Sequence, residues 1–221
     1  MTIQSSLRRT AVRVLIPILH RRNFRFAGTQ FSVDEGVLNP TLFRASLIFA
    51  RECRRLAGEK SSDILELGCG CGLTSVVLTL DGHRVTAIDN SLPAIRNTRA
   101  NAQTSNANVR AVCSDWDTAL KSALKFDLVV TNPPFLPSRP PMLEQALWGG
   151  PDLEIVKAAL AAAKRRIRPE GRILLLTSEQ SGRSEVLGAI ETTGLESVNN
   201  SVVRHWGERL HLDLLALFPC S

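Results

Sequence analysis

Residues 131–135 read Thr-Asn-Pro-Pro-Phe and follow an apolar run that is typical of a buried strand. The Asn132 side-chain oxygen and the Pro133 carbonyl are hydrogen-bond acceptors on neighbouring residues. Pro133 and Pro134 restrict the backbone φ angle, which would hold these acceptors rigidly, and Phe135 offers an aromatic face. The pattern allows a chemical role for this turn at the mouth of the strand. The alternative is structural, because two prolines also end a strand and a phenylalanine can fill a core.

A glycine-rich turn lies upstream, where residues 65–73 read Leu-Glu-Leu-Gly-Cys-Gly-Cys-Gly-Leu. Gly68, Gly70 and Gly72 come after a predicted strand and open a predicted helix. Glycine lets the backbone approach a ligand closely, and the amino end of a helix presents free N–H groups. The spacing differs from the Gly-x-Gly-x-x-Gly of dinucleotide-binding folds. The turn predicts a ligand site, with an ordinary tight strand-to-helix turn as the alternative.

Acidic residues follow the next two predicted strands. Asp89 lies about 20 residues after the glycine turn, where an acid in doubly wound folds binds ribose hydroxyls. Asp115 and Trp116 follow the third strand, and an acid beside an aromatic ring can hold and cover an adenine. A helix cap at Asp89 and an ordinary loop acid at Asp115 are the alternatives. All four motifs fall at the carboxyl ends of successive strands, where open α/β sheets bind ligands.

The elements that must position these motifs alternate from residue 63 onward. Apolar strands that alternate with helices indicate a parallel sheet covered on both faces. We therefore predict a Rossmann-like, doubly wound α/β fold with a mostly parallel seven-stranded sheet, helices on both faces and an antiparallel C-terminal hairpin strand. The hairpin is expected to turn at Gly207 and Glu208. The expected strands span residues 63–68, 84–90, 109–116, 126–132, 171–179, 195–206 and 209–218, and the expected helices span residues 49–58, 73–80, 92–103, 152–167 and 183–193.

The four motifs together resemble a class I S-adenosylmethionine-dependent methyltransferase. The resemblance is carried by Glu-x-Gly-x-Gly-x-Gly after the first strand, acids after the second and third, and Asn-Pro-Pro-Phe after the fourth. Asn-Pro-Pro followed by Tyr or Phe resembles the branch that methylates nitrogen. Residues 147–160 and 206–218 resemble the HemK/PrmC-like glutamine methyltransferases in particular. The similarity covers roughly residues 31–218.

The resemblance implies S-adenosylmethionine as the cofactor, S-adenosylhomocysteine as its product, and no metal. It implies N-methylation of a macromolecule, either a glutamine side chain of a protein or a base amine of RNA or DNA, with the acceptor held by Asn132, Pro133, Pro134 and Phe135. A small-molecule methyltransferase and a non-catalytic binding module with this fold are the alternatives. The implied cofactor-binding residues are Glu66, Gly68, Cys69, Gly70, Gly72, Asp89, Asn90, Asp115, Trp116 and Asn132.

The net charge of +6 comes from the start of the chain. Residues 1–33 hold six arginines and no acid, whereas the rest of the chain carries 21 basic and 21 acidic side chains. We therefore expect a basic N-terminal arm or helix at residues 1–33 and a methyltransferase domain at residues 34–221. The arm could pack on the domain, contact an acidic partner such as RNA, or act as a targeting peptide. Packing is favoured by an apolar stripe at helical spacing, formed by Val12, Leu15, Ile16 and Leu19.

Cysteine and histidine positions indicate no metal site. The five cysteines form no Cys-x-x-Cys pair, and the four histidines are scattered. Reduced thiols are typical of cytosolic proteins, and no apolar run reaches the ~18 residues that a membrane span needs. We therefore expect a cytoplasmic protein without a membrane span, and the sequence leaves its oligomeric state open.

Overall fold

The computed structural model describes residues 23–135, 149–150, 152–205 and 207–218. Seven strands of these residues form one sheet in the order β5-β4-β3-β6-β7-β9-β8. β5, β4, β3, β6 and β7 run parallel, whereas β9 is antiparallel to both β7 and β8. This confirms the predicted mostly parallel sheet with an antiparallel C-terminal strand. The strands are β3 (Asp63–Leu67), β4 (Arg84–Asp89), β5 (Arg110–Cys113), β6 (Phe126–Thr131), β7 (Ile167–Ser178), β8 (Leu195–His205) and β9 (Glu208–Leu217).

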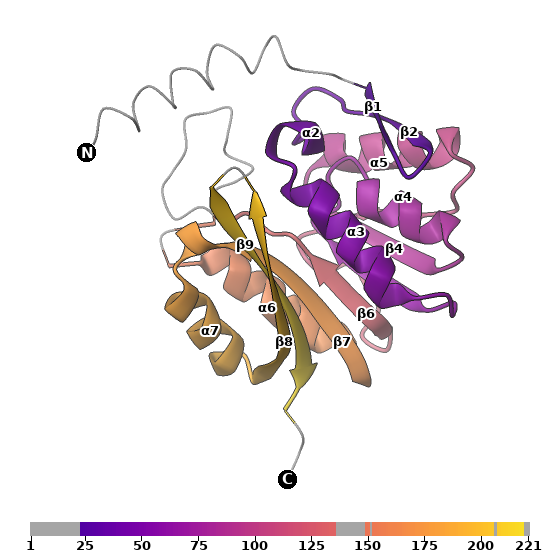
Figure 1. Ribbon diagram of the computed structural model, residues 1–221. Helices are drawn as coiled ribbons and strands as arrows, with labels where there is room; N and C mark the ends of the chain where they lie inside the picture. The colour runs from indigo at the N-terminus through magenta and orange to yellow at the C-terminus, as the bar shows by residue number, and fades with distance from the viewer. Residues whose placement is uncertain (1–22, 136–148, 151, 206, 219–221) are drawn as a thin grey trace.

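Helices cover both faces of this sheet, as predicted (Figure 1). α3 contacts α4, which contacts α5, whereas α6 contacts α7 on the opposite side. No helix of the described residues is both long and apolar enough to cross a membrane. The longer helices are α3 (Ala45–Ala57), α4 (Leu73–Leu80), α5 (Leu92–Thr104), α6 (Glu154–Arg166) and α7 (Arg183–Thr192), and the short ones are α2 (Pro40–Phe43) and η2 (Glu179–Ser181).

The centre of the sheet is buried on both faces. Ile64 and Leu65 are adjacent in β3 and point to opposite faces, yet both are fully buried. Val129 and Val130 show the same pattern in β6. Such continuous apolar runs are typical of parallel strands sandwiched between helices. The ends of β3 and β6 are therefore anchored in the buried centre of the sheet.

The first described residues form a hairpin of β1 (Asn23–Phe26) and β2 (Thr29–Ser32). Its two turn residues, Ala27 and Gly28, have φ angles of 49° and 82°, as a two-residue type I′ turn requires. The backbone N–H of Ser32 donates to Asn101 of α5 at 2.9 Å, which ties the hairpin to the domain. Residues 23–32 therefore belong structurally to the domain, although they lie within the expected basic arm. The predicted apolar stripe of that arm lies outside the described residues.

The C-terminal hairpin forms as predicted, with its turn moved by one residue. His205 pairs with Glu208, so β9 begins at Glu208 and not at Arg209. Gly207 has a φ of 80°, a left-handed conformation that glycine adopts without a steric penalty. β9 therefore lies between β7 and the edge strand β8.

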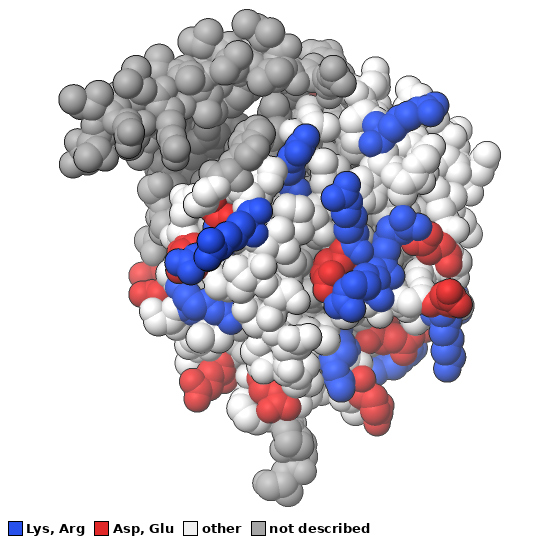
Figure 2. Space-filling model, in the orientation of Figure 1, with Lys and Arg blue, Asp and Glu red and all other residues white. Residues whose placement is uncertain are grey.

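Charges of both signs are interspersed on the face of the molecule shown in Figure 2. Arg54 of α3 pairs with Asp81 at 2.5 Å, and Arg84 pairs with Asp63 at 2.7 Å. This distribution agrees with the equal numbers of acidic and basic side chains after residue 33. The described residues form no extended basic surface on this face.

Candidate active site

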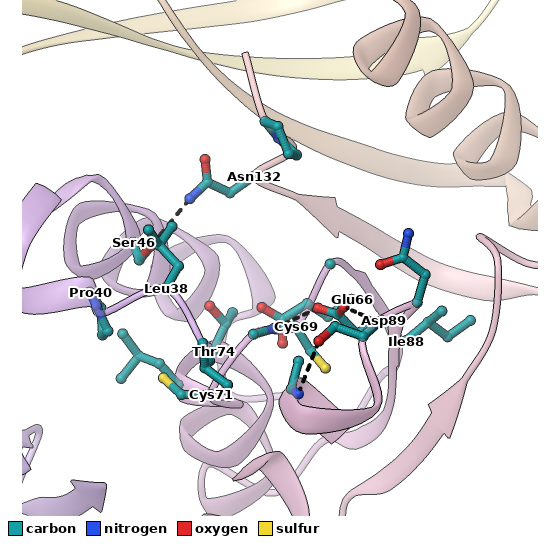
Figure 3. A pocket seen from close by; sticks show the side chains of 18 of the residues that line it. Leu38, Pro40, Ser46, Glu66, Cys69, Cys71, Thr74, Ile88, Asp89 and Asn132 are labelled. Carbon is teal, nitrogen blue, oxygen red and sulfur yellow. Dashed lines mark hydrogen bonds between the residues drawn. The ribbon is translucent and has the colours of Figure 1, made fainter. Parts of the chain in front are cut away.

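A cavity of about 530 Å³ lies at the carboxyl ends of β3, β4, β5 and β6 (Figure 3). It brings together the four motifs that the sequence places after these strands. Three of the predicted site residues, Gly72, Pro133 and Phe135, belong to these motifs without lining the cavity. The predicted residues that line it are Glu66, Gly68, Cys69, Gly70, Asp89, Asn90, Asp115, Trp116, Asn132 and Pro134.

The glycine turn has left-handed backbone at each of its three glycines. At Gly68 and Gly70 an added Cβ would meet no atom within 4 Å, so the backbone faces open space. Gly72 differs, because a Cβ there would lie 2.8 Å from a Thr98 side-chain carbon of α5. The first two glycines therefore leave room for a ligand, and the third allows α4 and α5 to pack closely.

Asp89, the last residue of β4, is hydrogen-bonded to the glycine turn. One carboxylate oxygen accepts the Gly70 N–H at 3.0 Å, and the other accepts the Ser91 N–H at 2.9 Å. Burial raises the pKa of Asp89 above its ordinary value of 3.8, and the two backbone N–H groups oppose that change. The N-cap of α5 is Ser91, whose hydroxyl accepts the Ala94 N–H at 3.4 Å. The carboxylate of Asp89 is therefore left at the cavity wall with unused lone pairs.

Glu66 is a buried carboxyl group in β3, and only 4 % of its surface is exposed. Burial raises its pKa from 4.5 to about 7, and the nearby negative charge of Asp89 contributes in the same direction. The hydroxyl group of Ser75 in α4 donates a hydrogen bond to this carboxyl group. The sequence motif identified Glu66, but it gave no sign of the support from Ser75.

Asp115 and Trp116, which follow β5, line the cavity. The Asp115 carbonyl accepts hydrogen bonds from the Thr118 N–H at 3.2 Å and the Thr118 hydroxyl at 2.8 Å. Trp116 has a φ of 48°, which is uncommon for a bulky residue. It packs partly buried against the main core, which holds its ring beside the cavity. A role for this pair in binding adenine stays a prediction.

Asn132 is the first residue after β6 and forms part of the cavity wall. Its Nδ2 donates to the hydroxyl oxygen of Ser46 in α3 at 3.4 Å, as Figure 3 shows. Its Oδ1 is buried and accepts no hydrogen bond from the described residues. An unpaired buried amide oxygen is costly, because the desolvated acceptor loses its bonds to water. Contact between this oxygen and a methyl acceptor stays a prediction.

The rest of Asn-Pro-Pro-Phe is contacted by two segments that lie later in the sequence, at Gly149 and Ser181. Gly149 packs so closely on the turn that an added Cβ would lie 2.8 Å from the Pro134 carbonyl oxygen. The Ser181 hydroxyl donates to the Phe135 carbonyl at 3.0 Å. The Phe135 side chain belongs to the main hydrophobic core, and its contact with an acceptor stays a prediction.

Further residues line the cavity although no sequence motif marks them. Residues 36–40 contribute Gly36, Val37, Leu38 and Pro40 to it, and α6 contributes Ile155. Two buried asparagines of α5 bind backbone groups, one at Asp34 and one in the glycine turn. Asn97 accepts the Asp34 N–H at 3.1 Å, and Asn101 donates to the Cys71 carbonyl at 2.8 Å.

The cysteines of the glycine turn are buried free thiols. Burial raises the pKa of Cys71 to about 12 and that of Cys69 well above its ordinary value, so neither is a reactive thiolate at neutral pH. Among the described residues, no group of three or more His, Cys, Asp or Glu side chains is placed to hold a metal ion.

Comparison with known proteins identifies the family. The Methyltransferase small domain family matches residues 44–198. A release factor glutamine methyltransferase of Bordetella pertussis is 33 % identical over 135 residues, which are 60 % of this chain and 49 % of that protein. A putative protein N5-glutamine methyltransferase of Methanocaldococcus jannaschii is 27 % identical over 150 residues, 65 % of this chain and 75 % of that protein. The chain thus spans about half the length of the Bordetella relative.

A solved structure with this fold is the 16S rRNA N2 G1207 methyltransferase (RsmC) of Thermus thermophilus, in complex with AdoMet and guanosine. It matches with a TM-score of 0.63 at 21 % identity, over 86 % of this chain and 49 % of that chain. At this identity the likeness concerns the fold alone. Together with the family match over residues 44–198, these relatives confirm the class inferred from the sequence motifs. The chain belongs to the Methyltransferase small domain family and is of the HemK/PrmC type.

Proposed function

We propose that the protein methylates the side-chain amide nitrogen of a glutamine in a protein, with S-adenosylmethionine as the methyl donor. The observation that carries this proposal is the buried, unpaired Oδ1 of Asn132. Asn132 lines the same cavity as the open backbone of the glycine turn and Asp89. One end of the cavity thus suits a nucleoside with an amino-acid chain, and the other end suits an N–H donor.

The residues at the cofactor end fit S-adenosylmethionine. The open backbone at Gly68 and Gly70 leaves room for the methionine part, beside the buried carboxyl of Glu66. The Asp89 carboxylate can accept the ribose hydroxyls, and Asp115 with Trp116 can take the adenine. When bound, this cofactor supplies a methyl group on a positively charged sulfur. The protein's part is to fix the nucleoside and to keep water away from that group.

The residues at the acceptor end fit a neutral amide. Described lining residues near Asn132 are the apolar Leu38, Pro40 and Ile155, together with the hydroxyl of Ser46. No lysine or arginine is among the described lining residues, so this part of the wall offers no basic side chain to a phosphate group. An amide nitrogen is a poor nucleophile because its lone pair is delocalised. Acceptance of an N–H group by Asn132 Oδ1 would help to hold that lone pair in line with the methyl group.

The names of the relatives support glutamine as the methylated residue. The Bordetella and Methanocaldococcus relatives are named as glutamine methyltransferases, and the first of them acts on a release factor. We therefore propose a peptide-chain release factor as the protein substrate.

The test is methyl transfer to a purified bacterial release factor from tritiated S-adenosylmethionine. Protein-bound tritium and a peptide carrying one extra methyl group on a glutamine are the expected results. A release factor with that glutamine changed to alanine is the control and should stay unlabelled. No label in the release factor with the wild-type chain would refute the proposal.

A further inference from the structure

The link between β5 and β6 spans residues 114–125, all of them described, and forms neither a helix nor a strand. It carries Asp115 and Trp116, which line the cavity. Their place therefore depends on hydrogen bonds and packing rather than on a regular element. We infer that Arg166, the last residue of α6, is a positioning residue that holds Asp115 and Trp116 in place for the adenine of the cofactor. This inference rests on the proposed function, in which this pair takes the adenine.

The Arg166 guanidinium binds the link at several points. Its Nη2 donates to the Asp117 carbonyl at 3.0 Å and to the Leu120 carbonyl at 3.2 Å. Its Nη1 donates to the Lys121 carbonyl at 2.7 Å, and its Nε donates to the Asp117 carboxylate at 2.6 Å. A guanidinium only donates, and carbonyl and carboxylate oxygens only accept, so the direction of each bond is fixed. Because only 8 % of the Arg166 side chain is exposed, water has little access to replace these bonds.

The support continues from Asp117 to the two residues at the cavity. Asp117 directly follows Trp116, so its bonds to Arg166 hold the backbone next to the indole ring. The Thr118 N–H and hydroxyl both donate to the Asp115 carbonyl, at 3.2 and 2.8 Å. Trp116 has a φ of 48°, an unfavourable conformation that persists in a bulky residue only when its surroundings hold it. Loss of the Arg166 bonds should therefore let the ring leave its place beside the cavity.

Arg165 offers a matched control, because it binds the same carboxylate from the preceding position of α6. Its Nη2 donates to Asp117 at 2.6 Å, but within the described part of the chain it donates to no backbone carbonyl of the link. Its side chain is 57 % exposed, and exposed ion pairs contribute little to stability. Lysine keeps a positive charge but lacks the planar fork of donors. Only at Arg166 does the change to lysine therefore remove bonds to carbonyls of the link.

Arg166→Lys in two backgrounds tests this inference, with calorimetric binding of S-adenosylhomocysteine as the measurement. In the wild-type background, the Kd should rise about fivefold, because the adenine wall loses part of its support. In the Trp116→Ala background, the same change should raise the Kd by less than about twofold, since most of the contact with the base is then already lost. Arg165→Lys should change the Kd by less than about twofold in both backgrounds.

Urea denaturation shows whether each variant is folded before binding is measured. If Arg166→Lys does not fold, Asp117→Asn takes its place. Asparagine removes the charge that anchors the guanidinium but leaves the backbone carbonyls where they are. The same difference between the wild-type and Trp116→Ala backgrounds is then expected.

Four outcomes overturn the inference. An equal rise in Kd in both backgrounds would mean that Arg166 acts through the fold and not through Trp116. An equal rise for Arg165→Lys and Arg166→Lys would mean that charge near Asp117, and not the bonds to carbonyls, sustains binding. An unchanged Kd for Arg166→Lys, beside normal wild-type binding, would refute the role of Arg166 and leave the proposed function intact. No binding of S-adenosylhomocysteine by the wild-type chain would refute the proposed function, and this inference with it.

Discussion

Glu66→Gln should remove a pH dependence from the stability of the protein. Burial raises the pKa of Glu66 from 4.5 in the unfolded chain to about 7 in the folded protein. Between these pH values the folded protein keeps a proton that the unfolded chain has lost. Because the folded state then binds more protons, the free energy of unfolding falls as pH rises from 4.5 to 7. Glutamine stays neutral at every pH and can still accept the hydrogen bond from Ser75.

The magnitude follows from the two pKa values. Their difference of about 2.5 corresponds to about 3 kcal/mol, at 1.36 kcal/mol for each pKa unit. Glu66 is 4 % exposed, so solvent screening reduces this figure little. The stability of Glu66→Gln relative to wild type should therefore improve by about 3 kcal/mol between pH 4.5 and pH 7.5. The raised pKa of Asp89 acts in both proteins, and the difference between them isolates Glu66.

Urea denaturation followed by tryptophan fluorescence, at half-unit pH steps from 4.5 to 8, measures this difference. Glu59→Gln, at an exposed position, is the control and should give a curve parallel to wild type. Parallel curves for wild type and Glu66→Gln would refute the reasoning, because Glu66 would then titrate alike in both states. If the cofactor's ammonium group lies near Glu66, its affinity should also rise with pH across this window in wild type and not in Glu66→Gln.

Three further substitutions test other parts of the site. Asp89→Ala should weaken S-adenosylmethionine binding by about 1.5–3 kcal/mol, the scale of hydrogen bonds to a charged group, and calorimetry showing unchanged affinity would contradict the ribose role. Asn132→Ala should abolish methyl transfer, while its affinity for the cofactor stays within a few-fold of wild type. Near-normal turnover of this variant in the tritium assay would show that Asn132 does not bind the methyl acceptor. Gly72→Ala should destabilise the fold by about 1–3 kcal/mol, because its Cβ would lie 2.8 Å from Thr98 in a left-handed backbone. A thermal melt equal to wild type would show that α4 and α5 can move apart freely.

The sheet and its four motifs were predictable because their signals are local. The helix expected at residues 73–80 is α4 (Leu73–Leu80), since an apolar run bounded by Gly72 and Asp81 leaves little freedom in its limits. β3 (Asp63–Leu67) and β6 (Phe126–Thr131) were found within one residue, because turn-forming residues follow both. Glycines and prolines mark strand ends whatever the rest of the chain does.

The parts that sequence reasoning missed depend on contacts between distant residues. β1 and β2 have four residues each, which is too few for a clear alternating pattern of apolar and polar side chains. The arginines near them favoured the interpretation of residues 1–33 as a basic arm. The bond between Asn132 and Ser46 joins residues 86 positions apart, and neither neighbourhood indicates the other. Gly28 was a local sign of the hairpin turn, because glycine readily adopts the positive φ that this turn requires.

The two interpretations of Asn-Pro-Pro-Phe, strand stop and acceptor grip, are compatible in this fold. The chain runs outward from β3 through β4 to β5 and then returns to form β6 beside β3. Leu67 and Thr131, the last residues of these two strands, are register partners. Gly68 and Asn132 each follow one of them, so the glycine turn and the acceptor motif begin about 4.8 Å apart, one strand spacing. Pro133 and Pro134 directly follow Asn132 and end β6 level with the end of β3. Asn132 therefore stays beside the glycine turn. Ligands in open α/β sheets bind at such a reversal of strand order, and here the reversal itself joins the proposed donor site to the proposed acceptor site.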